Sequence, residues 1–84
     1  MSALLLDLCE EDQSKEVMAD VYVELRRSTE IHGGFRSQHE AYAILKEEVD
    51  ELWDGIRHQD CNSRIRKEAI QIAAMAIRFV MDFT

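Results

Sequence analysis

The residues most able to do chemistry are acidic and lie close together in the middle of the chain. Between positions 47 and 54 the carboxylates are Glu47, Glu48, Asp50, Glu51 and Asp54. Carboxylate oxygens are ligands that Mg²⁺, Mn²⁺ and Ca²⁺ prefer, so this segment can supply half of a divalent-cation site. It can equally be the solvated outer face of a helix, where charged side chains normally lie.

Helical spacing divides these acids into two groups. At about 100° per residue, Glu48 and Glu51 lie where the acidic arc of a helix meets its apolar arc, and Glu47 lies just outside that border. Ile44 falls between Glu48 and Glu51, which indicates that this edge faces protein rather than bulk water. Asp50 lies on the outer arc, where a solvated surface charge is expected.

A further carboxylate, Glu68, occupies a similar border in the next helical segment, beside Ile65 and Ile72. If the two segments pack antiparallel through a short turn, Glu48 and Glu51 approach Glu68. Three carboxylates at one point repel each other strongly unless a cation lies among them. The pattern therefore predicts a divalent-cation site between two helices, with an ordinary solvated surface as the alternative.

Three helices are expected to position these groups, at about Ser14 to Ile31, Gln38 to Arg57 and Arg64 to Phe83. In the first helix, residues at helical spacing form one apolar stripe that ends in a serine: Val17, Val21, Leu25 and Ser28. In the second helix, Tyr42 and Trp53 lie on the apolar arc. They are expected in the core, with stacking on a nucleobase as the alternative.

Turn and capping residues mark the ends of these helices. Gly33 suits the position after the first helix, because glycine enters the left-handed conformation without strain. Ser37 and Glu40 form a predicted capping box, in which the serine caps the Glu40 amide while Glu40 reaches back. Asn62 or Ser63 is expected to be the N-cap of the third helix.

Composition and the third helix together predict an all-α subunit that assembles with copies of itself. The chain has no proline and only three glycines, so helix breakers are almost confined to Gly33 and Gly34. From Ala69 to Phe83 nearly every position is apolar, and a helix of this kind is buried on several sides. We therefore expect a small subunit of three main helices that forms a helical bundle across a homo-oligomer interface, in a homodimer or homotetramer.

Charge, length and cysteine content exclude several classes of protein. At 84 residues the chain is expected to be one domain, 1–84, with a weakly specified lead-in at 1–12. Its 17 acidic residues outnumber 10 basic ones, and the net charge of −7 repels nucleic-acid polymers. The most apolar run, 69–81, is shorter than the ~20 residues of a membrane span. Cys9 and Cys61 match no metal or disulfide pattern, so we expect a reduced, cytoplasmic protein.

Two carboxylate motifs stand on successive expected helices. Residues 47–51 read Glu-Glu-Val-Asp-Glu, and residues 68–71 read Glu-Ala-Ile-Gln after 16 intervening residues. This arrangement resembles the MazG-like family of all-α nucleoside triphosphate pyrophosphohydrolases, whose signature is Glu-Glu-x-x-Glu on one helix and Glu-x-x-Asp on the next. The resemblance covers roughly residues 14 to 83 and includes 32-HGGFRSQHEA-41 and 72-IAAMAIRF-79.

The resemblance implies hydrolysis between the α- and β-phosphates of a (d)NTP, which gives a (d)NMP and pyrophosphate. It implies Mg²⁺ as the cofactor, with Mn²⁺ as a substitute, held by Glu48, Glu51, Glu68 and Gln71. Glu47 and Glu48 are expected to be the catalytic carboxylates. Glu47 is interpreted as a metal ligand or as a base that orients the attacking water.

Substrate contacts are expected from residues near the two motifs and in the glycine loop. They are Arg78, Lys67, Arg64, Phe35 and His32. Each also has a simpler interpretation. Arg78 can pair with Asp82 at i,i+4, and Arg64 and Lys67 can be surface cations near a helix start. Phe35 can plug the end of the bundle.

One position departs from the family pattern. Residue 71 is glutamine where the family has aspartate, and its amide oxygen is a weak Mg²⁺ ligand without charge. Either the site works with three carboxylates, or activity is reduced or lost. The competing interpretation is a non-catalytic or nucleotide-binding helical oligomer with a degenerate metal site, which acts as a protein-interaction module.

Overall fold

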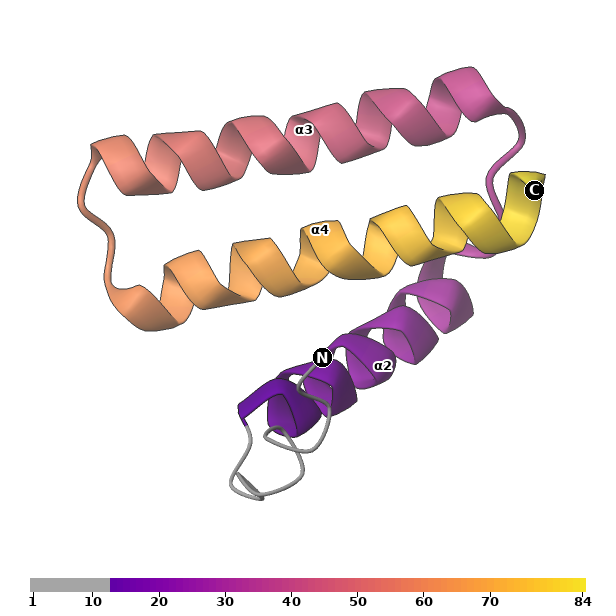
Figure 1. Cartoon of the computed structure of the whole chain (residues 1–84). Coiled ribbons are helices and arrows are strands. Elements are labelled where there is room, and N and C mark those ends of the chain that lie inside the picture. The colour runs from indigo at the N-terminus through magenta and orange to yellow at the C-terminus, as the bar shows by residue number, and fades with distance from the viewer. Residues whose placement is uncertain (1–12) are drawn as a thin grey trace, which may run out of the picture.

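The structure, a computed structural model, describes residues 13–84, and these form three helices without a strand (Figure 1). The helices are α2 (Gln13–His32), α3 (Gln38–Arg57) and α4 (Asn62–Phe83). The all-α prediction is confirmed for this part of the chain, and each predicted helix overlaps its observed counterpart closely. None of the three helices combines the length and apolar character needed to cross a bilayer. The lead-in expected at residues 1–12 lies outside the described residues.

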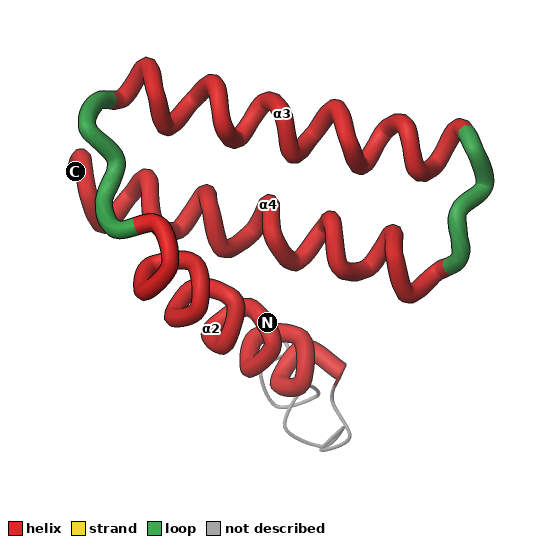
Figure 2. The backbone as a smooth tube through the Cα atoms, turned by 180° about the vertical axis from the view of Figure 1, so that it is seen from behind, coloured by secondary structure: helices red, strands yellow, loops and turns green. Residues whose placement is uncertain are grey.

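α4 is the helix that packs against both of the others. It runs antiparallel to α3, and Figures 1 and 2 show the two side by side from opposite directions. α2 packs on α4 but diverges from α3, so α2 and α3 share no close backbone contact. Arg66 near the start of α4 pairs with Asp20 of α2 at 2.7 Å. α4 therefore lies between α2 and α3 and contacts both (Figure 1).

The contact between α2 and α4 is made by the stripe predicted for the first helix. Val21 and Leu25 of α2 are 8% and 9% exposed and pack against Ala74 of α4, which is fully buried. Ser28, the next position of the stripe, is buried too, and its hydroxyl donates to the Leu25 carbonyl at 3.1 Å. Val17, the first position of the stripe, is more than a third exposed. The stripe thus buries its last three positions.

Local signals at the α2–α3 connection give the expected geometry. Gly33 has a φ of 71°, and its amide donates to the Thr29 carbonyl at 2.9 Å, as expected for glycine just after a helix. Ser37 accepts a hydrogen bond from the Glu40 amide at 3.0 Å, which confirms the predicted cap. The Glu40 carboxylate reaches back to the Arg36 amide at 2.7 Å.

The α3–α4 connection is a tight turn of Schellman type. The Gln59 amide donates to the Ile56 carbonyl at 3.1 Å, and the Asp60 amide donates to the Gly55 carbonyl at 2.9 Å. Gln59 has a φ of 58°, a left-handed conformation in which glycine is the favoured residue. The chain thus reverses direction over residues 58–61 and enters α4 directly.

α4 begins earlier than the sequence predicts. Its N-cap is Cys61, which has an extended backbone and makes no side-chain capping bond. The prediction of Asn62 or Ser63 as the N-cap is wrong, because both lie in the first turn of α4. The compact Schellman turn explains the difference, since it already directs the chain into the helix.

One face of α3 is apolar but uncovered. Its members follow helical spacing and are all at least 45% exposed: Tyr42, Val49, Trp53 and Ile56. The prediction that Tyr42 and Trp53 lie in the core is therefore wrong for the single chain. The reason is that α4 covers an adjacent face of α3, where Ala41 and Gly55 are buried, and α2 does not reach α3.

Candidate metal centre

Three carboxylates from α3 and α4 converge between the two helices. Glu48 and Glu51 lie one turn apart on α3, and the antiparallel pairing brings Glu68 of α4 opposite them. One carboxylate oxygen from each of the three lies within 4.8 Å of the others. Oxygen ligands on opposite sides of one Mg²⁺ or Ca²⁺ ion are about 4–5 Å apart. The predicted convergence of these side chains is thus confirmed, at a spacing that one cation can bridge.

Two oxygens of this cluster are buried without a partner. They are Oε1 of Glu48 and Oε1 of Glu68. Nearly all buried polar atoms in folded proteins are hydrogen-bonded or bind an ion, and an ionised carboxylate oxygen only accepts. The group that would satisfy these two atoms is therefore a hydrogen-bond donor or a cation.

Burial and the neighbouring negative charges disfavour the charged forms of Glu48 and Glu51. Burial raises the pKa of Glu48, and the nearby charges of Glu51 and Glu68 raise it further. Burial is also the main cause that raises the pKa of Glu51, followed by the charge of Glu68. Glu47 adds a smaller contribution to both pKa values in the same direction. A bound divalent cation reverses this effect, because it favours the ionised carboxylates.

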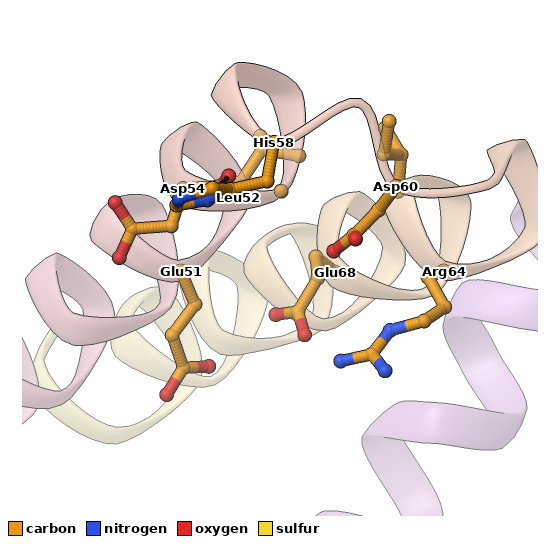
Figure 3. A pocket seen from close by; sticks show the side chains of 9 residues that line it. Glu51, Leu52, Asp54, His58, Asp60, Arg64 and Glu68 are labelled. Atoms are coloured by element: carbon orange, nitrogen blue, oxygen red, sulfur yellow. Dashed lines mark hydrogen bonds between the residues drawn. The ribbon is translucent and has the colours of Figure 1, made fainter.

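The first of two pockets beside the cluster, which we call the turn pocket, opens toward the α3–α4 connection. Its volume is about 640 Å³. It is lined by Glu51, Leu52, Asp54, Gly55, His58, Asp60, Arg64, Ile65 and Glu68. Figure 3 shows Glu51 of α3 and the Glu68 and Arg64 side chains of α4 extending toward the same side of the helix pair. Arg64 thus adds a cation to an otherwise acidic pocket.

The second pocket, which we call the central pocket, is lined by residues of all three helices and of the glycine loop. Its volume is about 400 Å³. It is lined by Glu24, Arg27, Ser28, Gly33, Gly34, Phe35, Glu40, Ile44, Glu48, Gln71, Met75 and Arg78. The fold therefore brings Gln71, Arg78 and Phe35 to the same pocket as Glu48, which belongs to the carboxylate cluster.

Arg78 is buried at the far end of the central pocket from the cluster. Only 3% of it is exposed, and its Nη2 donates to the Gly33 carbonyl. Its guanidinium lies 4.3 Å from the centre of the Phe35 ring, a cation–π contact. Phe35 in turn stacks on Phe83, with ring centres 6.4 Å apart. The alternative interpretation from the sequence, an ion pair with Asp82, is not what this residue forms; it binds the glycine loop instead.

The remaining predicted site residues differ in their relation to the two pockets. Glu47 is exposed on α3 next to Glu48, and Arg64 lines the turn pocket. Lys67 is exposed on α4 and lines neither pocket. The side chain of His32 lies outside what the structure describes, so its expected substrate contact stays a prediction.

Glu24 of α2 is a residue of this region that the sequence interpretation missed. It lines the central pocket, and its charge contributes to the raised pKa of Glu48. Its carboxylate forms a two-point ion pair with Arg27, at 2.9 and 3.1 Å. A signal was present, because Glu24 borders the buried stripe of α2 just as Glu48 borders that of α3. What the pattern did not give was the side of α4 on which α2 packs.

The donor set of the cluster is that of a hard divalent cation. Three carboxylates and no nitrogen or sulfur ligand suit Mg²⁺, Mn²⁺ or Ca²⁺ better than zinc or copper. The two open pockets leave room for a ligand beside such a cation. Comparisons of the chain with protein-family models, with curated proteins and with solved structures found no match.

Proposed function

We propose that this protein is a Mg²⁺-dependent nucleoside triphosphate pyrophosphohydrolase. The observation that carries the proposal is the cluster of Glu48, Glu51 and Glu68, in which two buried carboxylate oxygens have no partner. Such a cluster is costly without a cation, and it lies at the junction of two pockets that can hold a phosphorylated ligand. The resemblance of the two carboxylate motifs to the MazG-like pattern supplies the reaction.

Each residue of the centre has a defined task in this proposal. Glu48, Glu51 and Glu68 would hold the cation, which when bound would neutralise phosphate charge and activate a water molecule. Glu47 is exposed beside them and orients the water that attacks a phosphorus atom. Gln71 lines the central pocket with Glu48 and offers an amide as a neutral contact there.

We also propose that the active form is a homodimer or homotetramer. The support is the uncovered apolar face of α3 together with exposed Ile77, Val80 and Met81 on α4. Among the described residues no large side chain is fully buried, so one subunit offers a small core. Analytical ultracentrifugation at micromolar concentration tests this: we expect a stable oligomer, and a well-folded monomer would contradict the proposal.

The reaction is tested by incubating the protein with a panel of NTPs and dNTPs in the presence of Mg²⁺ or Mn²⁺. We expect release of pyrophosphate and the matching monophosphate, and loss of this release in Glu48→Gln. Asp50→Asn is the matched control, because Asp50 is an exposed carboxylate on α3 that pairs with Lys46 at 3.2 Å. If no nucleotide gives pyrophosphate, or if Glu48→Gln is as active as the control, the protein is not this enzyme.

A second candidate function is nucleotide binding without hydrolysis. The observation that favours it is that Arg78 is held by the glycine loop, while residue 71 brings no charge to the cation site. Calorimetry with a nucleotide analogue and Mg²⁺ separates the two candidates when it is combined with the pyrophosphate assay. Binding without product supports this second function, whereas binding with product supports the hydrolase.

A further inference from the structure

The central pocket contains a polar group that the proposed chemistry leaves unused. Arg78 forms part of its lining, and Nη1 of its guanidinium is buried without a hydrogen-bond partner. Nη2 is engaged with the Gly33 carbonyl, and the guanidinium face lies on Phe35. The side chain is therefore fixed in position while one of its donors stays free.

A buried guanidinium N–H without a hydrogen-bond partner is energetically unfavourable. Arginine stays charged and has donors but no acceptor, so only an acceptor can satisfy Nη1. A buried donor left alone costs about 1–3 kcal/mol, more when it is charged. The contacts with the Gly33 carbonyl and the Phe35 ring hold the Arg78 side chain in place in the pocket wall. A ligand that brings an acceptor would therefore meet a preorganised donor.

The distance along α4 shows which part of a nucleotide can reach this donor. Arg78 is ten residues after Glu68, which is about 15 Å at the helical rise of 1.5 Å per residue. That figure is the separation of the two Cα atoms along the axis of α4, and Glu48 of the cluster lines the same pocket as Arg78, so the pocket runs from the cluster to the guanidinium. A nucleotide with its phosphates at the cluster would extend along the central pocket and present its base to Arg78.

The size of the central pocket agrees with this orientation. Its 400 Å³ fall within the range of about 300–1,000 Å³ that is typical of small-molecule sites. Met75 and Ile44 supply apolar wall, and Gln71 supplies an amide that can donate or accept. These groups suit a planar ring with polar edges.

We propose that the central pocket selects nucleobases that carry a ring carbonyl, with Nη1 of Arg78 donating to the carbonyl oxygen. Guanine, hypoxanthine, uracil, thymine and cytosine each carry such an oxygen, whereas adenine carries none and presents an amino donor. The inference rests on the proposed function for the placement of the phosphates at the carboxylate cluster. It goes beyond that function because it assigns the specificity of the pocket to one residue.

The test compares two ligands that differ by one oxygen atom, so the protein need not be altered. Inosine monophosphate carries the carbonyl, and purine riboside monophosphate lacks it. We expect calorimetry with Mg²⁺ to show at least about tenfold tighter binding of the first, as befits one hydrogen bond to a charged donor. Equal affinities, or no binding of either ligand, would overturn the inference.

A variant then assigns the preference to Arg78. Arg78→Lys keeps the charge and shortens the donor, and we expect the preference to fall toward equality in protein whose helicity by circular dichroism is native. Arg57→Lys is the control, since Arg57 is exposed, lines neither pocket and pairs at 3.1 Å with Asp54, which is not part of the central pocket. An unchanged preference in folded Arg78→Lys would assign the discrimination to another residue and contradict the inference.

The binding measurement separates this inference from the proposed hydrolase activity. Selective binding without release of pyrophosphate from any triphosphate would refute the hydrolase and keep the base selection. Pyrophosphate release from all triphosphates, together with equal binding of the two monophosphates, would keep the hydrolase and refute the base selection.

Discussion

The two ends of the central pocket carry opposite charges and satisfy them in different ways. At one end the positive Arg78 is buried against neutral partners, the Gly33 carbonyl and the Phe35 ring. At the other end Glu48 adjoins Glu51 and Glu68, and two of their buried oxygens have no partner. The first end is stabilised mostly by groups of the chain itself, whereas the second leaves two buried oxygens that a cation or a hydrogen-bond donor would satisfy.

This difference indicates which end helps to hold the fold and which end can bind a cation. Arg78 links α4 to the glycine loop that ends α2, so its contacts are part of the tertiary structure. Burial, and after it the charges of the neighbouring carboxylates, raises the pKa of Glu48 and of Glu51. Side chains that destabilise their own environment are a common mark of a binding or catalytic site.

The largest expected effect is at the Arg78 end. Arg78→Ala leaves the Gly33 carbonyl without its donor and the Phe35 ring without its cation, and it opens a cavity. We expect the free energy of unfolding in urea to fall by about 3 kcal/mol. Arg57→Ala removes only an exposed ion pair, so about 0.5 kcal/mol is expected for it. If both variants lost a similar free energy of unfolding, the Arg78 end would not have the structural role described above.

The next effect is the response of the acidic end to Mg²⁺. A cation that binds only the folded protein adds about 2.7 kcal/mol at one hundred times its Kd. We expect thermal denaturation to show this stabilisation in the wild type and in Asp50→Asn, and its loss in Glu48→Gln. Stabilisation that persists in Glu48→Gln would place the cation elsewhere.

A smaller effect is expected at the two connections that flank α3. Both contain a left-handed residue, but one is Gly33 (φ 71°) and the other is Gln59 (φ 58°). Gln59→Gly should stabilise the protein by up to about 1 kcal/mol, and Gly33→Ala should destabilise it by a similar amount. Chemical denaturation of the two variants measures both changes. If both substitutions changed the free energy of unfolding in the same direction, the left-handed backbone conformation would not be the cause of the two changes.

The smallest effect is the pH dependence of the metal-free protein. Because the folded-state pKa of Glu48 lies above its ordinary value of 4.5, the folded protein binds more protons than the unfolded chain just above pH 4.5. The contribution of Glu48 and Glu51 to the free energy of unfolding therefore falls as pH rises from about 4.5 through their raised pKa values. Above those pKa values it is constant. Glu48→Gln should flatten that part of the stability profile relative to wild type in EDTA. A variant whose profile parallels that of wild type would show that Glu48 is not destabilised by folding.

The helices and the carboxylate cluster could be predicted because the signals for them are local. Ser37 and Glu40 cap α3 through hydrogen bonds within four residues, and Gly33 ends α2 through its own conformational freedom. The convergence of Glu48 with Glu68 follows from a short turn between two periodic helices. Each of these features needs only sequence spacing and helical geometry.

The features that could not be predicted depend on where α2 packs. The contact of Arg78 with the Gly33 carbonyl joins residues far apart in the sequence. Glu24 reaches the central pocket only because α2 lies on one side of α4. Trp53 is exposed because α2 leaves that face of α3 uncovered, although its periodicity is that of a core residue. Periodicity identifies which face of a helix is apolar, but it does not identify the partner that covers it.

The position of α4 between two helices that do not contact each other has a consequence for the order of unfolding. α3 and α4 form a hairpin of neighbouring segments, whereas α2 is attached through a separate face of α4. α2 can therefore detach without breaking the hairpin, as one cooperative unit of lower stability. In hydrogen–deuterium exchange of the native protein, we expect the amides of α2 to exchange before the central amides of α3 and α4. Such an opening would uncover the central pocket from one side while leaving Glu48, Glu51 and Glu68 together.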